Sequence, residues 1–441
     1  MNRCIFLLYN LLFPFALLFL LPGFLKRMLK RGNYRHKFGQ RFSIYSQRVT
    51  AGLLAIRSEA IWVHAVSVGE VLVALKFIQA LRKENPDQAV VLSSTTSTGF
   101  TLAHKHLRTI PRTQVIYHPV DFYPSVNRIM NLLRPCALIM VEAEIWPNLT
   151  HAAKKHGALL ALINSRLSPR SERRYLRIRP FLGGLFRQLD WIGVQAEADI
   201  TRFTALGARA ETLHSVGSIK YDQLGQPAPA KNPDLSKILT QVRGPASRPV
   251  LLAGSTHAGE EKIIAETFLQ LRKQLPDLFL ILVPRHAERR QDVLSDLQSL
   301  GLSATLRSAA QHEVNDILLV DSTGELSSWY CEADVVFIGK SLTGRGGQNP
   351  VEALAAGKPV VFGPHMKNFP QLTTELLAAK GAIQVADKDE LHNTLLQLFR
   401  SPETCKNLSQ AGQEVLTPHQ GATQRTVQKI LTKLTAPHRE S

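Results

Sequence analysis

Three acidic residues occupy positions where a carboxylate can act as a base. Glu70 follows Ser67-Val68-Gly69, after an apolar strand-like run and at the start of a helical stretch. There it either stabilises the helix through its dipole, by about 0.3–1 kcal/mol, or acts, ionised at neutral pH, as a general base toward a hydroxyl. Glu142 and Glu144 follow the apolar run Ala137–Val141, where acids are costly unless they meet water or partners. These positions indicate a catalytic site, and the residues alone leave open which of Glu142 and Glu144 faces it.

A glycine-rich segment, Gly339–Pro364, has the features of an anion-binding loop that leads into a helix. Asn349 suits the N-cap, Pro350 suits the first helical position, and Glu352 lies three residues after the cap. Free N–H groups and the helix dipole favour an anion at such an N-terminus. An ordinary strand–helix turn has the same glycines, so both interpretations stay open. The P-loop pattern is excluded, because no Gly-Lys-Ser/Thr follows at the required spacing.

Three further polar segments follow strand-like runs in the second half of the chain. The hydroxyl and amide groups of Ser255 and Thr256 suit a phosphate. Arg285, followed by His286, offers a planar guanidinium for a phosphate or a carboxylate. Gly324-Glu325-Leu326 supplies an acid for a ribose or a base, with helix capping as the simpler explanation. We expect these segments to converge on the glycine-rich loop.

The elements that position these residues alternate between apolar runs and helical stretches, which predicts an α/β fold with doubly wound parallel sheets. The expected strands are Ile61–Val66, Ala89–Ser93, Val115–Tyr117, Ala137–Val141, Leu159–Ile163, Trp191–Val194, Val250–Ala253, Leu278–Val283, Asp316–Val320, Val335–Ile338 and Val360–Phe362. No GxGxxG occurs in either half, which argues against a nicotinamide or flavin cofactor.

A Pro-rich polar stretch, QLGQPAPAKNPDLS, follows Asp222 and indicates a linker. We therefore expect a Rossmann-like domain over residues 31–221, a linker over 222–248 and a second Rossmann-like domain over 249–435. Because ligands bind at the carboxyl ends of the strands in such sheets, we expect a cleft between the two domains.

The N-terminal residues 5–25 form a mostly apolar run, interrupted by two prolines, that is just long enough to span a bilayer. A basic segment follows from Lys26 to Arg41, which places the downstream chain in the cytoplasm by the positive-inside rule. The order of charges is the reverse of that in a cleaved signal peptide. We expect residues 1–30 to be an uncleaved membrane anchor that either spans the bilayer or lies in its interface.

The formal net charge of +18 is concentrated in two segments. Residues 1–58 hold ten Lys and Arg and no acid, and Arg166–Arg187 holds seven arginines against Glu172 alone. Such local patches suit an anionic membrane surface or a phosphorylated lipid. No helix-turn-helix, zinc-finger or aromatic RNA-binding pattern is present, so we expect no nucleic-acid partner.

Cysteine and acid spacing argue against a metal site. The four cysteines are widely separated and form no CxxC pair, which excludes a zinc ribbon and fits a reducing compartment. Metal-dependent sugar transfer needs a D-x-D in the site, and the only one, Asp387-Lys388-Asp389, precedes a C-terminal helical stretch. We interpret it as a helix cap and predict no metal.

Taken together, these segments resemble the Kdo (3-deoxy-D-manno-octulosonic acid) transferases of lipopolysaccharide biosynthesis, which are membrane-anchored glycosyltransferases of the GT-B fold. The resemblance covers almost the whole chain. The segments that carry it, in order, are HAVSVGE, ExEIWPN, NSRLSPRS, GSIKYD, STHAGEE, LVPRH, GEL and GGQNPVEA.

The resemblance implies inverting transfer of Kdo from CMP-Kdo to a lipid A precursor, lipid IVA, at the cytoplasmic face of the inner membrane, without a metal or other cofactor. Glu70 would be the general base, and Lys220 and a Glu of the ExE segment (Glu144 in preference to Glu142) would stabilise the transition state. The residues implied to bind CMP are Ser255, Thr256, Arg285, His286, Gly324, Glu325, Leu326, Asn349, Pro350, Val351 and Glu352. Those expected to contact acceptor phosphates or anionic membrane lipids are Arg166, Arg170, Arg173 and Arg174, with the flank 26–41.

The glycine-rich loop departs from the family pattern at two positions. Lys340 stands where the family usually has a glycine, and Gln348 stands where it usually has a histidine. A histidine contact to the donor therefore lacks its residue here, whereas Lys340 adds a cation near the leaving group.

Two alternative functions remain open from the residues. One is another lipid-acting GT-B transferase that uses a UDP-sugar, such as a lipid A disaccharide synthase or a MurG-type transferase. The other is a catalytically silent, membrane-bound protein that only binds a nucleotide. The ExEIWPN and LVPRH segments argue against the first, and intact acids at Glu70, Glu142 and Glu144 argue against the second.

Overall fold

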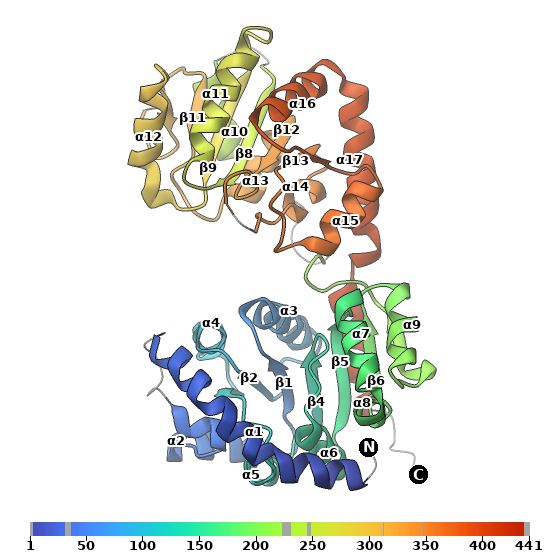
Figure 1. The fold of residues 1–441 in the computed structure, drawn as a ribbon. Helices are drawn as coiled ribbons and strands as arrows, with labels where there is room; N and C mark the ends of the chain where they lie inside the picture. Colours follow the sequence, from blue (N-terminus) through green and yellow to red (C-terminus); the bar gives the residue numbers. More distant parts are fainter. Residues whose placement is uncertain are drawn as a thin grey trace. The chain divides into compact units, whose positions relative to one another are not determined.

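The computed structural model describes residues 3–30, 37–222, 231–244, 248–311, 313–344 and 346–435. The chain forms two compact units, one of Met1–Asp222 with His419–Ser441 and one of Gln223–Pro418. Each unit contains one parallel sheet with helices packed against it (Figure 1).

The first unit is built on a seven-stranded sheet in the order β3-β2-β1-β4-β5-β6-β7. Its strands are β1 (Ile61–Ala65), β2 (Val90–Ser94), β3 (Thr113–Tyr117), β4 (Ala137–Val141), β5 (Leu159–Ser165), β6 (Trp191–Val194) and β7 (Leu213–Ser215). β1, β4, β5 and β6 are buried along their whole length, because helices cover both faces. Burial on both faces explains why these strands are continuous apolar runs and not alternating patterns.

Helices of the first unit pack on both faces of its sheet. They are α1 (Arg3–Lys30), α2 (Gln47–Leu54), α3 (Val68–Glu84), α4 (Ser97–Leu107), α5 (Tyr123–Leu133), α6 (Pro147–Lys155), α7 (Pro169–Arg177), α8 (Arg179–Phe186), α9 (Glu197–Ala205) and α18 (Ala422–Thr435). On one face, α3, α4 and α18 share a buried cluster that includes Phe77 and Val427. On the other, α2, α5, α6, α8 and α9 share a cluster that includes Ile129 and Phe186.

The second unit has its own seven-stranded parallel sheet in the order β10-β11-β9-β8-β12-β13-β14. Its strands are β8 (Val250–Thr256), β9 (Phe279–Pro284), β10 (Thr305–Leu306), β11 (Ile317–Leu319), β12 (Val335–Ile338), β13 (Val360–Phe362) and β14 (Ile383–Gln384). Its helices are α10 (Pro233–Arg243), α11 (Glu260–Arg272), α12 (Arg290–Ser299), α13 (Leu326–Glu332), α14 (Val351–Ala355), α15 (Pro370–Ala378), α16 (Lys388–Arg400) and α17 (Pro402–Leu416). α11, α12 and α16 bury their apolar faces in one cluster with β8, β9 and β12.

The predicted α/β class with parallel sheets is confirmed, and each expected strand overlaps an observed one. The sequence does not predict β7, β10 and β14, because strands of two or three residues have no apolar run to identify them. The D-x-D segment is a helix cap as predicted, since the Asp387 carboxylate accepts the Glu390 N–H at the start of α16 (3.0 Å).

The observed division of the chain differs from the expected one at two places. Helix α18 belongs to the first unit, where it packs against α3, whereas the second domain was expected to extend to residue 435. Helix α10 lies inside the expected linker 222–248, because its Pro233 is a favourable first helical residue and not a linker proline. Residues 223–230 and 245–247 of that linker lie outside the described residues.

The apolar N-terminal run forms α1, a helix that contains both Pro14 and Pro22. In the part of the chain that the structure describes, no helix combines the length and apolarity required to cross a membrane. The expected spanning helix is therefore not found. Within the expected basic flank, Arg41 is buried over the Tyr117 ring (4.5 Å) and cannot contact a membrane, and residues 31–36 lie outside the described ones.

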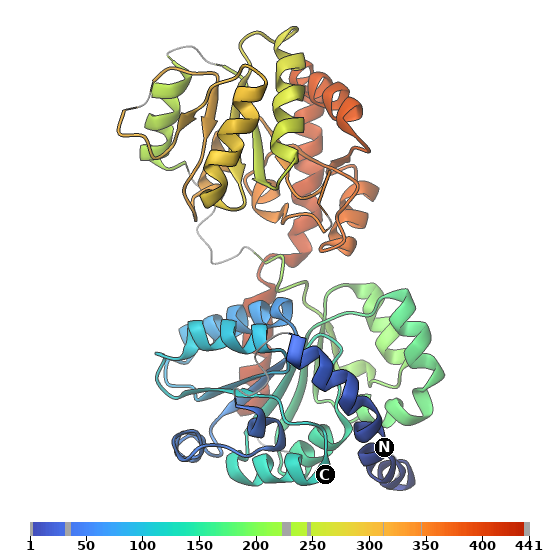
Figure 2. The same cartoon turned by 60° about the vertical axis from the view of Figure 1, so that its left-hand side comes forward.

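Helix α1 lies along the outer side of α5 and α6 (Figures 1 and 2). The Tyr9 hydroxyl donates to the Asp121 carboxylate (2.9 Å), and the Phe6 ring lies 4.5 Å from the His151 ring. Asp121 also accepts the N–H groups of Asn148 (3.0 Å) and Leu149 (2.9 Å) and so caps α6. One buried carboxylate therefore holds both the N-terminal helix and the helix that follows the ExE segment.

Two histidines are buried beside the carboxyl edge of the first sheet. His64 lies in β1 with its Nδ1 3.0 Å from the Ser93 hydroxyl, and its ring stacks on that of His118 at 3.6 Å. Burial lowers the pKa of His64 to about 3 and lowers that of His118 well below its usual value, with His64 and Arg41 adding to the second shift. Both rings are therefore neutral in the folded protein.

This pair predicts acid sensitivity of the first unit. Because the folded-state pKa is depressed, only the unfolded chain binds these protons as the pH falls below about 6.5, so stability falls with it. For each histidine, the free energy of unfolding falls by about 1.4 kcal/mol as the pH is lowered from 7.5 to 5.5. The free energy of unfolding should therefore differ less between pH 7.5 and pH 5.5 in His118→Gln than in wild type, by about 1.4 kcal/mol. It is measured from urea titrations of amide exchange in β1 and β2. His106→Gln, on an exposed face of α4, is the control, and an equal pH dependence in wild type and His118→Gln would contradict the prediction.

Candidate active site

Glu70 lies in the first turn of α3 and is almost fully buried. Its carboxylate accepts the Ser67 N–H (3.2 Å), the Ser67 hydroxyl (2.8 Å) and the Val66 N–H (2.8 Å), while Ser67 Oγ accepts the Glu70 N–H (3.4 Å). Ser67 and Glu70 therefore form a capping box at the start of α3. Burial raises the pKa of Glu70 to about 7; the hydrogen bonds from Val66 and Ser67 oppose this shift, and Glu142 and Glu144 add to it. With a pKa of about 7, the carboxyl can gain or lose its proton near neutral pH.

Glu142 and Glu144 both act on Glu70 because the chain turns sharply after β4. Glu142 has a φ of 62°, in the left-handed region, which ends the strand and removes the alternation that would send the two side chains to opposite sides. Its N–H donates to the Ile163 carbonyl (2.9 Å), and its carbonyl accepts the Ser165 hydroxyl (2.9 Å). Burial, and then Glu142, raise the pKa of Glu144. The structure thus gathers three carboxylates at one edge of the sheet.

Lys220 brings a cation to the same edge. Burial lowers the pKa of its ammonium, Glu142 raises it, and Arg166 lowers it further. Glu142 and Arg166 therefore both lie within electrostatic reach of Lys220. Arg166, expected to contact the acceptor or the membrane, belongs to this edge with the carboxylates.

The segment Gly217–Asp222 that carries Lys220 is held by side chains from distant elements. Lys76, on α3, donates to the carbonyls of Ile219 (3.3 Å), Lys220 (3.3 Å) and Asp222 (3.1 Å). Asn164 Oδ1 accepts the Ile219 N–H (2.9 Å). Because Lys76 is on the same helix as Glu70, one helix supports both the carboxylate and the cation of the edge.

Asp222 ties the C-terminal helix to this segment. Its carboxylate accepts the N–H groups of Gly421 (2.9 Å) and Thr423 (2.7 Å) at the start of α18, and the Ser218 N–H donates to His419 Nδ1 (3.1 Å). Residue 222 is the last of the first unit before the chain leaves it, and 419 is the first after the chain returns. Both crossing points are therefore fixed beside Lys220.

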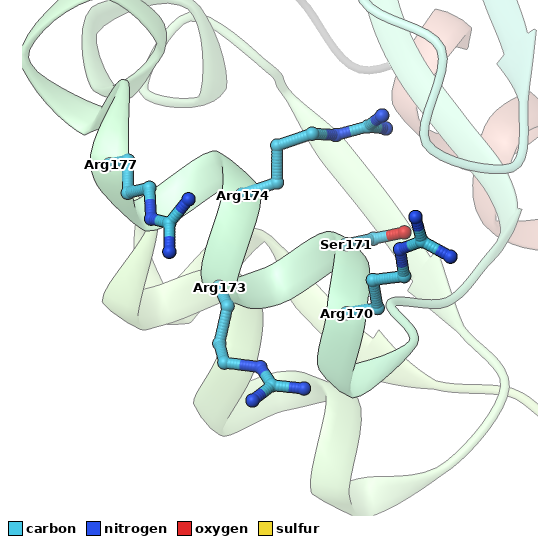
Figure 3. A pocket seen from close by; sticks show the side chains of 5 residues that line it. All are labelled: Arg170, Ser171, Arg173, Arg174 and Arg177. Carbon is cyan, nitrogen blue, oxygen red and sulfur yellow. The ribbon is translucent and has the colours of Figure 1, made fainter.

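Helix α7 carries a cationic pocket of about 430 Å³ (Figure 3). Its lining consists of Arg170, Ser171, Arg173, Arg174 and Arg177. Three of the four arginines expected to contact the acceptor or a membrane are thus gathered on one helix, and Arg166 is not among them. Guanidinium groups bind phosphate oxygens through paired hydrogen bonds, so the pocket suits a phosphorylated ligand.

In the second unit, the glycine-rich loop is anchored on a fully buried carboxylate. Glu260, in the first turn of α11, accepts the N–H groups of Lys340 (2.5 Å), Ser341 (2.8 Å), Leu342 (2.9 Å) and His257 (3.0 Å). These amides precede the remaining glycines of the loop and face inward, so they are not available to an anion. Anion binding by this loop therefore depends on the residues after Leu342.

The backbone at Gly339 and Lys340 is constrained. A Cβ on Gly339 would lie 2.4 Å from the Ser255 carbonyl oxygen, so only glycine fits there. Lys340 has a φ of 58°, in the left-handed region that glycine occupies without strain. The Lys340 side chain contributes to lowering the pKa of His257, after burial, so the ammonium lies near that ring.

The candidate nucleotide residues of β8 and β9 lie side by side. The Arg285 N–H donates to the Thr256 carbonyl (2.9 Å), and the His286 and His257 rings are 5.9 Å apart. Thr256 is fully buried, whereas Arg285 and His286 are exposed. The two basic side chains are therefore accessible to a ligand at this edge.

Glu325 is engaged within the protein. Arg307 donates to both of its carboxylate oxygens (3.1 and 2.9 Å) and Ser322 Oγ donates at 2.5 Å. Burial raises the pKa of Glu325, but the hydrogen bonds from Arg307 and Ser322 outweigh it, so that the pKa is lowered overall. Glu325 occupies the N-cap position of α13 as the simpler explanation expected, but its side chain makes no capping bond to the helix. A nucleotide contact through its carboxylate has to compete with Arg307.

Helix α14 starts one residue later than predicted. It runs from Val351 with Pro350 at the N-cap, and Asn349 Oδ1 accepts the Val351 N–H (3.2 Å). Burial, and then the Glu352 carboxylate, raise the pKa of Tyr330 on α13, so Glu352 lies near that ring. A Cβ on Gly254 would lie 2.7 Å from the Tyr330 hydroxyl. The end of β8, α13 and α14 therefore lie close together.

Comparison with known proteins identifies the family. A family model for 3-deoxy-D-manno-octulosonic-acid transferases matches residues 36–223. The chain is 32% identical to the 3-deoxy-D-manno-octulosonic acid transferase of Haemophilus influenzae, over 90% of this chain and 91% of that protein. It is 33% identical to that of Bordetella pertussis, over 88% of this chain and 90% of that protein.

The chain belongs to the Kdo transferase family. A solved glycosyltransferase from Rickettsia africae covers 86% of this chain and 99% of its own at 12% identity, with a TM-score of 0.53. That likeness concerns the fold alone, and it agrees with two Rossmann-like units as in GT-B glycosyltransferases.

The sequence does not single out several residues that build the site of this Kdo transferase. Asn164, Asp222 and Glu260 lie inside segments that carry the family resemblance, but their partners are far away in the chain. Lys76 and Arg307 lie outside those segments, and the only mark of Lys76 is that it is a cation inside the mostly apolar stretch 71–80 of α3. Long-range hydrogen bonds to backbone groups have no sequence pattern, which is why these residues are missed.

The Glu260 anchor predicts a local loss of stability in Glu260→Gln. A glutamine has one acceptor oxygen, and its amide group would oppose the backbone N–H groups, at a cost of about 3 kcal/mol. We expect amide exchange in the peptide 339–347 to accelerate about 100-fold, measured by mass spectrometry. Glu266→Gln on the same helix breaks only the partly exposed pair with Lys388 (3.0 Å) and should cost less than about 1 kcal/mol. Equal exchange in the two variants would contradict the anchor.

Proposed function

We propose that this protein is an inverting glycosyltransferase that moves Kdo from CMP-Kdo to a lipid A precursor, lipid IVA, in lipopolysaccharide biosynthesis. Family membership supports the reaction class. The observation that carries the mechanism is Glu70, a buried carboxylate with a pKa of about 7 beside two further acids and a half-buried lysine. A base is most effective when its pKa lies near the working pH.

In the proposed reaction, Glu70 takes the proton of the acceptor hydroxyl as its oxygen bonds to the anomeric carbon of Kdo. The bond from that carbon to the phosphate oxygen breaks, and CMP leaves as an anion. Direct attack inverts the anomeric centre and needs no covalent intermediate. Lys220 faces the negative charge of the donor, and Glu142 or Glu144 faces the positive charge that develops on the sugar ring. Glu142 is the carboxylate that interacts with Lys220. Glu144 is the one that the family resemblance favours for stabilising the transition state.

The second unit supplies the proposed CMP site. Arg285 and His286 are exposed basic groups that suit the CMP phosphate, and Lys340 adds a cation near His257. Ser255, Thr256, Gly324–Leu326 and Asn349–Glu352 complete the proposed site.

The arginine pocket of α7 is the proposed contact for the phosphates of the acceptor. Leu176, Ile178 and Phe181, on and after α7, are exposed apolar side chains that suit the acyl region of the same lipid. A helix that combines arginines with exposed apolar groups is typical of protein surfaces at a lipid interface.

We further propose that the protein works at the cytoplasmic face of the inner membrane, with α1 lying in the interface. Exposed apolar side chains along α1 support this placement. They are Leu7, Leu8, Leu11, Leu12, Phe15, Leu18 and Phe19, exposed by 46–86%. A helix held to the protein along one side and apolar on the other can bury that side in the headgroup region.

Glu70→Gln tests the function and separates the two roles of this residue. Glutamine also supports a capping box, so the variant should fold, but it cannot accept the proton and turnover should fall about 10²–10⁴-fold. Product formation from CMP-Kdo and lipid IVA is followed by mass spectrometry, and UDP-sugars are tested in parallel. In wild type, kcat/KM should fall about tenfold per pH unit below pH 7, because protonation removes the base.

Ser67→Ala is the matched control, since it weakens the cap by about 1 kcal/mol but keeps the carboxylate. Because the Ser67 hydroxyl also stabilises the charged form of Glu70, its loss should raise the pKa of that carboxyl, so turnover should fall at pH 7 and recover at higher pH, whereas that of Glu70→Gln should not recover. Wild-type turnover by Glu70→Gln would contradict the mechanism. Transfer from a UDP-sugar but not from CMP-Kdo would show that the donor is a UDP-sugar. If no donor gives a product, the protein would be one that only binds a nucleotide.

Lys76 should act through Lys220. Lys76→Met removes the donor to three carbonyls but keeps the alkyl chain, so we expect kcat to fall about 10-fold or more while KM for CMP-Kdo changes little. Lys76→Arg should restore part of kcat, because it can still donate to these carbonyls. Loss of protein stability with an unchanged kcat would show that Lys76 is only structural.

A further inference from the structure

A cavity of about 360 Å³ lies between α1, the start of α5 and the second half of α6. This α1–α5–α6 pocket is within the size range of small-molecule sites. Phe6 and Leu7 line it from α1, and Phe122 and Asn127 line it from the start of α5. Its basic side lies away from the carboxyl edge that holds Glu70, and the proposed reaction gives the pocket no role.

The wall formed by α1 is held in place by specific contacts. The Phe6 ring packs against His151 of α6, and the Phe13 ring stacks on Phe122 at 6.4 Å. Between them, Tyr9 donates to the buried Asp121. The pocket is therefore a defined space under a docked helix.

One side of the pocket joins an apolar surface. Leu7 lines the pocket and is itself 68% exposed, and Leu8 and Leu11 continue the apolar surface along α1. A hydrocarbon chain of a ligand could pass Leu7 from this apolar surface into the largely apolar pocket. Burial of its surface on both would stabilise it.

Cations gather at the other side. Lys155, in the last turn of α6, lines the pocket together with His156. Burial, and then Arg134, Lys155 and Arg57, lower the pKa of His156, so these three cations lie near it. Arg134 follows α5 and Arg57 precedes β1, which places the group at the amino edge of the sheet.

We propose that the α1–α5–α6 pocket binds one acyl chain of an anionic bilayer phospholipid, whose phosphate is held by Lys155 with Arg57 and Arg134. Charge complementarity selects an anionic headgroup, and the apolar lining selects the chain. The inference rests on the proposed interfacial position of α1 and adds a bound lipid to it.

The position of the cations favours a bilayer lipid over the acceptor. α5 and α6 both begin at the carboxyl edge of the sheet and end at its amino edge, so the basic group lies at the opposite end from Glu70. The acceptor must bring its hydroxyl to Glu70, whereas a bilayer lipid has no such constraint.

The test uses the full-length protein with vesicles of phosphatidylcholine that contain phosphatidylglycerol with a diazirine in one acyl chain. After irradiation, we expect mass spectrometry to find label on peptides containing Phe6–Asn10 and Phe122–Asn127. Asn127→Trp fills the pocket from an exposed position on α5 and should reduce label on both peptides about fivefold or more. Labelling is repeated in detergent micelles that contain the probe, so a protein that does not float with vesicles is still tested.

Charge variants test the headgroup contact. Lys155→Glu should reduce labelling by the phosphatidylglycerol probe about fivefold and leave labelling by the matched phosphatidylcholine probe unchanged. Lys83→Glu, an exposed lysine at the far end of α3, makes the same change of charge away from the pocket and should have no effect.

Three results would overturn the proposal. The first is label confined to the exposed side of α1 and equal in wild type and Asn127→Trp. The second is loss of the label when one equivalent of unlabelled lipid IVA is added, which would make the acceptor the occupant. The third is equal labelling by both probes in wild type. Kdo transfer and vesicle flotation are measured on the same samples, so transfer without pocket labelling would overturn the pocket alone.

Discussion

Buried side-chain oxygens accept the backbone N–H groups of the loops that follow the parallel strands. Beyond the ends of parallel strands, the backbone N–H groups of the loops have no neighbouring strand to bind. A buried N–H group without a partner costs about 1–3 kcal/mol of stability. Glu260 accepts four such groups in the second unit, and Asp121, Asn164 and Asp222 each accept two or more donors in the first. These acceptors shape the loops, and the loops carry the residues proposed to act on substrate.

Glu70 shows how one acceptor can serve structure and chemistry together. Its hydrogen bonds from Val66 and Ser67 stabilise the charged form, and burial with Glu142 and Glu144 destabilises it. The balance leaves a pKa of about 7, which neither an exposed first-turn glutamate nor a fully buried one would have. Capping the helix and holding a proton at neutral pH are therefore parts of one arrangement, and the two interpretations of this residue do not exclude each other.

The sequence predicts the repeating parts of the fold well and the long-range ones poorly. Apolar runs and helix caps are local, so β1, β4, α3 and the cap at Asp387 follow from a few adjacent residues. The return of α18 to the first unit depends on contacts with residues about 200 positions earlier, and nothing in its own amphipathic pattern names the partner sheet. Lys76 is missed for the same reason, because its three acceptors are backbone carbonyls 143 to 146 residues away.

The same argument applies to the N-terminal helix, whose apolar composition does not determine what it packs against. A run of apolar residues predicts contact with hydrocarbon but does not distinguish a helix that crosses it from one that lies against a protein. Tyr9 decides the matter for one side of α1, because its hydroxyl reaches the buried Asp121. Since Asp121 also caps α6, which begins just after the ExE segment, a change in the docking of α1 would act on the same carboxylate that fixes this segment. The helix proposed to contact the membrane and the helix that follows the loop proposed to contact the sugar thus share one buried hydrogen-bond acceptor.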